Sequence, residues 1–259
     1  MSTELHTSRT DSTLVIAISG PETRNALHPD MVAAAIEILS TAERDDTIRA
    51  IILTGTDNCF CSGIDLHHLV EIRARGKTAQ IDSSDSLQTW IETIRNCTKP
   101  TIAAVEGAAI GSGLALALAC DLLVAGASAQ FMAANARVGL TPDSSASWLL
   151  TRALPRQLAT EMLVTGKSID AKRLYKIGMV NRVVADGTAL DAALILADEL
   201  AHLAPNVTTS IKTLIIEAQD KSLVQHFENE KHNFIESLNH RNSQEGISAF
   251  LAKRNPDFS

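Results

Sequence analysis

Residues 101–121 read TIAAVEGAAIGSGLALALACD. The β-branched run Thr101–Val105 predicts a strand, and the glycine turn after it leads into residues 114–119, which we expect to form a short helix. The apolar stretch between Glu106 and Asp121 is shorter than the ~20 residues that cross a bilayer. We therefore expect this segment to lie in a buried core.

Strands and helices alternate on both sides of this segment. Residues 13–19 (TLVIAIS) and 48–54 (IRAIILT) are rich in β-branched residues, which predicts two more strands. Between them, Pro29 stands at the first position of an expected helix, with the acid Asp30 in its first turn. Residues 122–125 predict a further strand. This alternation indicates an α/β fold built from strand–helix–strand crossovers.

The last third of the chain is predicted to be mainly helical. Helical periodicity runs through residues 189–203, 207–219, 223–238 and 244–253. We place a junction at Pro205, which gives an α/β core of residues 1–204 and a C-terminal helical region of residues 205–259. Residues 71–86 are polar and without pattern, so we expect either a mobile loop that forms a lid or an ordinary surface loop.

Composition excludes several classes of protein. Hydrophobic residues make up 45% of the 259 residues, which allows a sizeable core, and a net charge of -7 argues against nucleic-acid or membrane-surface binding. Four cysteines without further ligands at metal-binding spacing predict reduced thiols and no metal site. No basic segment opens the chain, so we expect no signal peptide and a cytoplasmic protein.

Two glycine-containing turns are candidates for an anion-binding site. Residues 60–66 (FCSGIDL) and 107–113 (GAAIGSG) each follow a predicted strand and precede a predicted helix. Such turns expose backbone N–H groups at a helix N-terminus, where the dipole favours negative charge. Either turn alone is explained by tight packing. If the two converge, their N–H groups would make a two-donor site for an oxyanion.

These turns, with other motifs in order, resemble those of the enoyl-CoA hydratase/isomerase (crotonase) superfamily. The resemblance runs from about residue 12 to the end of the chain. Its motifs are residues 21–27 (PETRNAL), 60–66, 103–121, 130–131 (QF), 138–143 (VGLTPD), 178–184 (GMVNRVV) and 245–254 (EGISAFLAKR).

The resemblance implies a fold, an assembly and a ligand. It implies a spiral of ββα turns with a C-terminal helical trimerisation region, assembled as a homotrimer or a dimer of trimers. It implies an acyl-CoA thioester as substrate, with coenzyme A entering as part of that substrate and no permanently bound cofactor. By position, the two oxyanion donors are the backbone N–H groups of Ile64 and Ser112. The family usually has glycine where this chain has Ser112.

The resemblance also carries over coenzyme A contacts. Arg24 and Ser62 stand at such positions near the first turn, whereas Phe250 and Lys253 belong to a C-terminal helix that would reach the site of a neighbouring subunit. A solvated surface position is the alternative for each charged residue.

Two glutamates that family hydratases use are missing from this chain. Their positions are taken by Ala115 and Asn135, neither of which can exchange a proton near neutral pH. One carboxylate, Asp143, stands where family isomerases have theirs, and the residues that follow it resemble the epoxyphenylacetyl-CoA isomerases. The alternative is that Asp143 only caps a helix over residues 144–150. Dehalogenases of the family place a nucleophilic Asp there but pair it with Trp at position 135.

Three further residues are candidates for contact with the acyl group. Asn135 would orient it or form a hydrogen bond inside the core. His68 would face the pocket as a second proton carrier or lie on a solvated helix face. Trp148 would line the pocket or pack in the core.

Three functions are consistent with these residues. The first is an enoyl-CoA isomerase that shifts a proton with Asp143 while Ile64 and Ser112 hold a thioester enolate. The second is a hydratase-like enzyme with non-standard catalytic groups. The third is a catalytically silent acyl-CoA binder.

Overall fold

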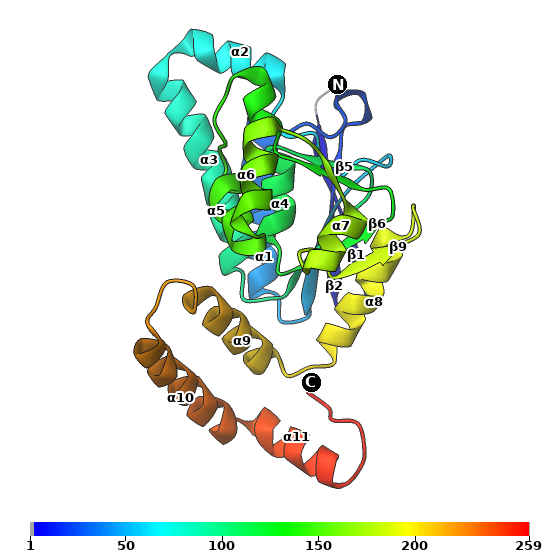
Figure 1. Cartoon of the computed structure of the whole chain (residues 1–259). Coiled ribbons are helices and arrows are strands. Elements are labelled where there is room, and N and C mark those ends of the chain that lie inside the picture. The colour runs from blue at the N-terminus through cyan, green and yellow to red at the C-terminus, as the bar shows by residue number, and fades with distance from the viewer. Residues whose placement is uncertain (1–2, 259) are drawn as a thin grey trace.

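A six-stranded sheet forms the centre of the computed structural model, which describes residues 3–258 (Figure 1). Only its first pair is antiparallel; every later pair of neighbours is parallel. Its strands in spatial order are β1 (Glu4–Thr10), β2 (Thr13–Ser19), β3 (Ala50–Gly55), β4 (Thr101–Val105), β6 (Leu122–Gly126) and β9 (Arg182–Val184). A second sheet holds β5 (Ala108–Ile110), β7 (Gln130–Met132) and β8 (Ile169–Asp170).

Helices cover both faces of the large sheet. Within the core they are α1 (Pro29–Arg44), α2 (Leu66–Arg75), α3 (Lys77–Asn96), α4 (Ser112–Ala119), α5 (Ala146–Ala153), α6 (Arg156–Thr165), α7 (Ala171–Ile177) and α8 (Ala189–Ala201). Two 3-10 helices, η1 (Pro21–Thr23) and η2 (Ala134–Val138), join them. The predicted α/β architecture is confirmed.

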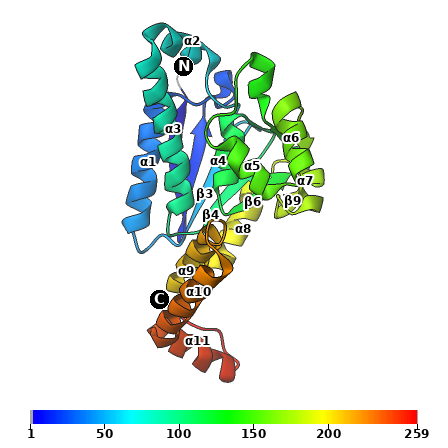
Figure 2. The same ribbon diagram turned by 60° about the vertical axis from the view of Figure 1, so that its left-hand side comes forward.

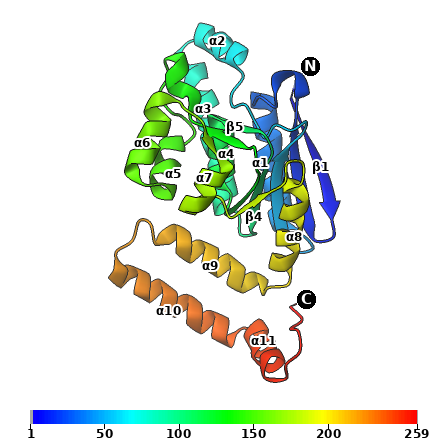
Figure 3. The same cartoon turned by 45° about the vertical axis from the view of Figure 1, so that its right-hand side comes forward.

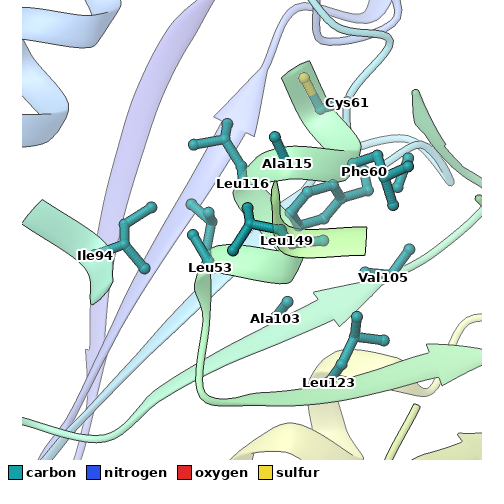
Figure 4. Close-up of a cluster of buried hydrophobic side chains, with 14 of the residues drawn as sticks. Leu53, Phe60, Cys61, Ile94, Ala103, Val105, Ala115, Leu116, Leu123 and Leu149 are labelled. Carbon is teal, nitrogen blue, oxygen red and sulfur yellow. The ribbon is translucent and has the colours of Figure 1, made fainter. Parts of the chain in front are cut away.

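Each buried strand contributes to two apolar cores. In β3, Ile51 and Leu53 join a larger core with α1, α3 and α4, whereas Ala50 and Ile52 join a smaller core against α8. Figure 4 shows Leu53 in the larger cluster with side chains of α4. Because successive side chains of a strand point to opposite faces, a sheet covered on both sides requires a continuous apolar run. This requirement explains the sequence AIIL in residues 50–53.

The structure corrects the prediction of a loop over residues 71–86. This segment is helical: α2 continues to Arg75, Gly76 (φ 92) forms a break, and α3 begins at Lys77. The buried stripe of α3 begins only at Leu87, so its first turns are mostly exposed and show no apolar pattern. The edge strand β1 was also missed, because its side chains are almost all exposed and polar.

The C-terminal region consists of α9 (Pro205–Glu217), α10 (Leu223–Asn239) and α11 (Arg241–Leu251). These helices extend away from the core in all three views (Figure 1, Figure 2 and Figure 3). They join it at the amino ends of β3 and β4, where Arg49 donates to the Leu203 carbonyl (2.7 Å) and Thr209 donates to the Thr98 carbonyl (2.9 Å). Among residues 3–258, no helix is long and apolar enough to span a membrane.

The parallel strands determine where a site can form. The segments after β2, β3 and β4 all leave the same carboxyl edge of the sheet, and both predicted glycine turns are among them. Parallel α/β sheets bind ligands at this edge. The C-terminal helices join the opposite edge, roughly 16 Å away along the five residues of β4.

Candidate active site

The two glycine turns run side by side as a short parallel ladder. The Cys61 N–H donates to the Ala108 carbonyl (3.0 Å), and the Ile110 N–H donates to the Cys61 carbonyl (2.9 Å). Cys61 therefore pairs with Ala109. Ile64 and Ser112 each lie three residues after a member of this pair. The two predicted donors therefore occupy equivalent positions in two neighbouring parallel segments.

Gly63 allows the two turns to approach this closely. Its φ is +90°, and a Cβ at this position would lie 2.8 Å from the Ile110 carbonyl oxygen and 3.4 Å from the Ser112 nitrogen. Both the backbone angle and the contact require glycine. Neither the Ile64 N–H nor the Ser112 N–H donates a hydrogen bond to another backbone group within residues 3–258. Two neighbouring amides therefore remain available to bind one oxygen.

The Asp143 carboxylate lies beside the second of these donors. Its Oδ1 accepts hydrogen bonds from the Ser112 hydroxyl (3.3 Å) and from Nδ2 of Asn135 (3.5 Å). The hydroxyl of Ser144 donates to that of Ser112 (3.1 Å). A chain of hydroxyl groups thus runs from Ser144 through Ser112 to one oxygen of the carboxylate.

The alternative role of Asp143 as a helix cap is wrong. Helix α5 begins at Ala146 with Ser145 as its N-cap, and no side chain caps it. Ser144 (φ 53) and Ser145 (φ 60) are both left-handed, which costs roughly 1–2 kcal/mol per non-glycine residue. This turn places the hydroxyl of the buried Ser144 against Ser112. The contact of Ser144 leaves no signal in the sequence, because the Ser-Ser pair has the composition of an ordinary capping segment.

Comparisons with known proteins identify the family of this chain. The family model described as enoyl-CoA hydratase/isomerase matches residues 8–259. The chain belongs to the enoyl-CoA hydratase/isomerase family. It is 32% identical to the 2,3-dehydroadipyl-CoA hydratase of Escherichia coli (98% of each chain covered) and 34% identical to the 1,2-epoxyphenylacetyl-CoA isomerase of the same organism (95% and 94%). A crystal structure of an enoyl-CoA hydratase from Polaromonas sp. JS666 superposes with a TM-score of 0.97 at 45% identity, covering 98% and 99% of the two chains. The crotonase fold is confirmed.

Neither of the two positions where family hydratases have glutamate carries an acid in this chain. Ala115 is fully buried in α4, in the cluster of Figure 4. Asn135 offers an amide, and its Oδ1 is buried without a hydrogen-bond partner among the described residues. Glu106, which precedes the second turn, accepts a hydrogen bond from the Ala189 N–H (2.9 Å) and so caps α8.

Cys61 supports the first turn without being a nucleophile. Its Sγ accepts a hydrogen bond from the Gly63 N–H (3.4 Å), and the side chain is fully buried. Burial raises the pKa of this thiol to about 12, so it stays protonated at neutral pH. All four cysteines are free thiols.

His68 lies near the Ile64 donor. It is in the first turn of α2, whose N-cap Asp65 accepts a hydrogen bond from the His67 N–H (2.8 Å). His68 is only 8% exposed, and its ring packs 5.4 Å from that of His28. The interpretation of His68 as a residue on a solvated helix face is therefore wrong.

Trp148 does not line the site formed by the two donors and Asp143. It is held between the guanidinium groups of Arg95 (4.2 Å) and Arg152 (3.7 Å). It lines a cavity of about 460 Å³ between the core and α9, together with Lys212. This cavity is lined by neither donor residue nor by Asp143.

The four predicted coenzyme A contacts fall into two groups. Arg24 and Ser62 lie together beside the first turn, because the Ser62 N–H donates to the Arg24 carbonyl (3.1 Å). Arg24 is exposed. Phe250, at 83% exposure, and Lys253 belong to the end of the C-terminal region, which joins the opposite edge of the sheet. The fold of one chain therefore brings only the first group to the site.

Proposed function

We propose that this family member is an enoyl-CoA isomerase in which Asp143 moves a proton along the acyl chain. Relatives carry both isomerase and hydratase names. Isomerisation is supported by the residues of the site, which offer two free amide donors and one adjacent carboxylate. Coenzyme A enters as part of the thioester, and no permanently bound cofactor is needed.

The amides of Ile64 and Ser112 would hold the thioester oxygen. Electron density moves onto this oxygen when a proton leaves the acyl chain, and each aligned donor contributes roughly 2.7–4 kcal/mol to stabilising the resulting enolate. Ser112 is the first residue of α4, so the helix dipole adds to this effect.

Asp143 would then act as the base. It removes a proton from one carbon of the acyl chain, and the enolate forms. The same carboxyl group returns the proton to a different carbon, so the double bond moves and no atom is gained or lost. The observation that carries this proposal is the 3.3 Å hydrogen bond between Asp143 Oδ1 and the hydroxyl of Ser112, the residue that supplies one oxyanion donor. Both of these hydrogen bonds, from Ser112 and from Asn135, engage Oδ1, which leaves Oδ2 for proton transfer.

Deuterium exchange tests this proposal without knowledge of the natural acyl group. Wild-type protein in D₂O should label the α-carbon of simple acyl-CoA thioesters, as followed by mass spectrometry. Asp143→Asn should lose exchange by about 10²-fold or more while it still binds the thioester. Asp11→Asn is a matched control, because Asp11 lies in the β1–β2 turn at the opposite edge of the sheet and its φ of 50° suits asparagine. Binding without exchange by the wild type would indicate a silent acyl-CoA binder.

A hydratase is the second candidate, because a relative of similar length is named 2,3-dehydroadipyl-CoA hydratase. Water would then need activation without the two missing glutamates. Hydration of crotonyl-CoA, followed as loss of the conjugated thioester absorbance, separates the two. An isomerase without the glutamates should show almost none.

We also propose that the C-terminal helices assemble the protein as a homotrimer or a dimer of trimers. Large apolar side chains are exposed along them, including Ile215, Phe227, Phe234, Ile235 and Phe250. Contact of Phe250 and Lys253 with coenzyme A would then occur at a neighbour's site. Analytical ultracentrifugation should give a trimer or hexamer, and Phe234→Asp should dissociate it. A monomeric wild type would contradict this assembly.

A further inference from the structure

Buried polar atoms without hydrogen-bond partners gather at the proposed acyl-CoA site. Within residues 3–258 these atoms are Nδ1 and Nε2 of His68, Oδ1 of Asn135 and Nδ1 of His226. His68 lies in α2, which follows the first glycine turn, and Asn135 lies in η2, where its Nδ2 donates to Asp143, whereas His226 lies in α10. Because an unpaired buried polar group costs about 1–3 kcal/mol, native proteins keep few of them, and those at a site are explained by a ligand that pairs with them.

Two consecutive residues, Leu27 and His28, contact Ile64 and His68 respectively. Leu27 forms a parallel bridge with Ile64, and the next residue, His28, packs its ring against that of His68. Helix α2 begins at Leu66, directly after the first glycine turn, and His68 lies in the first turn of this helix. Residues 27 and 28 therefore connect the buried imidazole of His68 to the segment that carries the oxyanion donor.

The groups around His68 leave Nε2 as the more open of its two ring nitrogens. Nδ1 lies 3.8 Å from a carboxylate oxygen of Glu71, and His28 Nδ1 lies 3.5 Å from a carboxylate oxygen of Asp30. Nε2 has no hydrogen-bond partner among the described residues. A hydroxyl group can pair with this nitrogen in either tautomer, because a hydroxyl both donates and accepts, and it can also donate to the free Oδ1 of Asn135.

We propose that the acyl group of the substrate carries a hydroxyl group, and that this hydroxyl forms a hydrogen bond with Nε2 of His68. This inference rests on the proposed function of the site as an acyl-CoA site. It narrows the substrate from any enoyl-CoA to oxygenated acyl-CoA thioesters. Asn135 Oδ1 offers a second acceptor for the same class of ligand.

Calorimetric binding to matched thioesters tests this assignment. The probes are phenylacetyl-CoA against its 2-, 3- and 4-hydroxyphenyl counterparts, and hexanoyl-CoA against 6-hydroxyhexanoyl-CoA, all with the Asp143→Asn variant so that no turnover interferes. We expect at least one hydroxylated ligand to bind about tenfold more tightly than its parent. His68→Leu should reduce the ratio of the two affinities to about one. His68→Gln, which keeps a side-chain acceptor, should retain part of the preference.

His67→Leu is the matched control, because His67 is exposed on the same turn of α2 and should leave the ratio of affinities unchanged. Equal binding of parent and hydroxylated ligands by the His68-containing protein overturns the inference, as does an undiminished preference in a folded His68→Leu variant. If neither parent nor hydroxylated thioesters bind, the acyl-CoA site itself is wrong, which is a separate outcome.

Discussion

Replacing Ser112 by glycine separates the two roles that the structure gives to this residue. The variant keeps the backbone N–H that would bind the thioester oxygen and removes the hydroxyl that donates to Asp143. The carboxylate then keeps only the 3.5 Å hydrogen bond from Asn135, and the buried hydroxyl of Ser144 loses its acceptor.

The expected loss can be estimated from these contacts. This hydrogen bond fixes the orientation of the carboxylate toward the acyl chain. The lost positioning should cost about 1.5 kcal/mol, the lower end of the range for a hydrogen bond to a charged group, because the contact is 3.3 Å long. We therefore expect kcat for isomerisation, or the rate of α-proton exchange, to fall about tenfold. KM should stay nearly constant, because the amide donor remains.

A second variant tests the direction of the hydroxyl chain. Ser144 reaches the carboxylate only through Ser112, so Ser144→Ala should lower kcat by less than Ser112→Gly and should add nothing further in the double variant. Steady-state kinetics of the two single variants and the double variant provide the test. Additive effects, or a rise in KM with unchanged kcat in Ser112→Gly, would refute the reasoning.

Two other predictions follow from the turns around the site. Gly63→Ala should lower kcat by about 10²-fold or more, because its Cβ would meet the Ile110 carbonyl and displace an oxyanion donor. Gly178 is the matched control, because it has the same φ of 90° but no atom lies within 4 Å of an added Cβ. Gly178→Ala should therefore lower only the stability of the protein. Equal losses of activity in both variants would count against this explanation. The buried Cys61 thiol stays protonated up to a pKa of about 12, whereas in the unfolded chain it ionises above pH ~8.5. Its contribution to stability is therefore complete below pH ~8.5 and is lost as pH rises toward 12. Denaturant unfolding should show the wild type losing about 2 kcal/mol more than Cys61→Ala between pH 8 and pH 10, and parallel losses would be the contrary result.

The elements of the fold could be predicted where burial leaves a pattern. The run in residues 50–53 and the proline at position 29 indicated β3 and α1 because both features have local physical causes. The first turns of α3 are exposed and polar, so nothing in residues 77–86 distinguished a helix from a loop. The exposed edge strand β1 was missed for the same reason.

The site was predictable only in part. Ile64 and Ser112 follow glycine turns, whose backbone requirements are visible in the sequence. The contact between Ser144 and Ser112 joins residues 32 positions apart, and no local spacing encodes it. Asp143 was open to two interpretations because Pro-Asp-Ser-Ser is also a capping sequence. The structure excludes the cap, because α5 begins at Ala146 without a side-chain cap and Asp143 instead accepts a hydrogen bond from Ser112.

The most direct test of the account is a crystal structure of the Asp143→Asn variant with a bound enoyl-CoA. The account predicts that the thioester oxygen lies about 3 Å from the nitrogens of both Ile64 and Ser112, with the side chain of residue 143 within about 3–3.5 Å of the α- or γ-carbon. A thioester oxygen bound away from these two amides, or residue 143 turned away from the acyl chain, would contradict it.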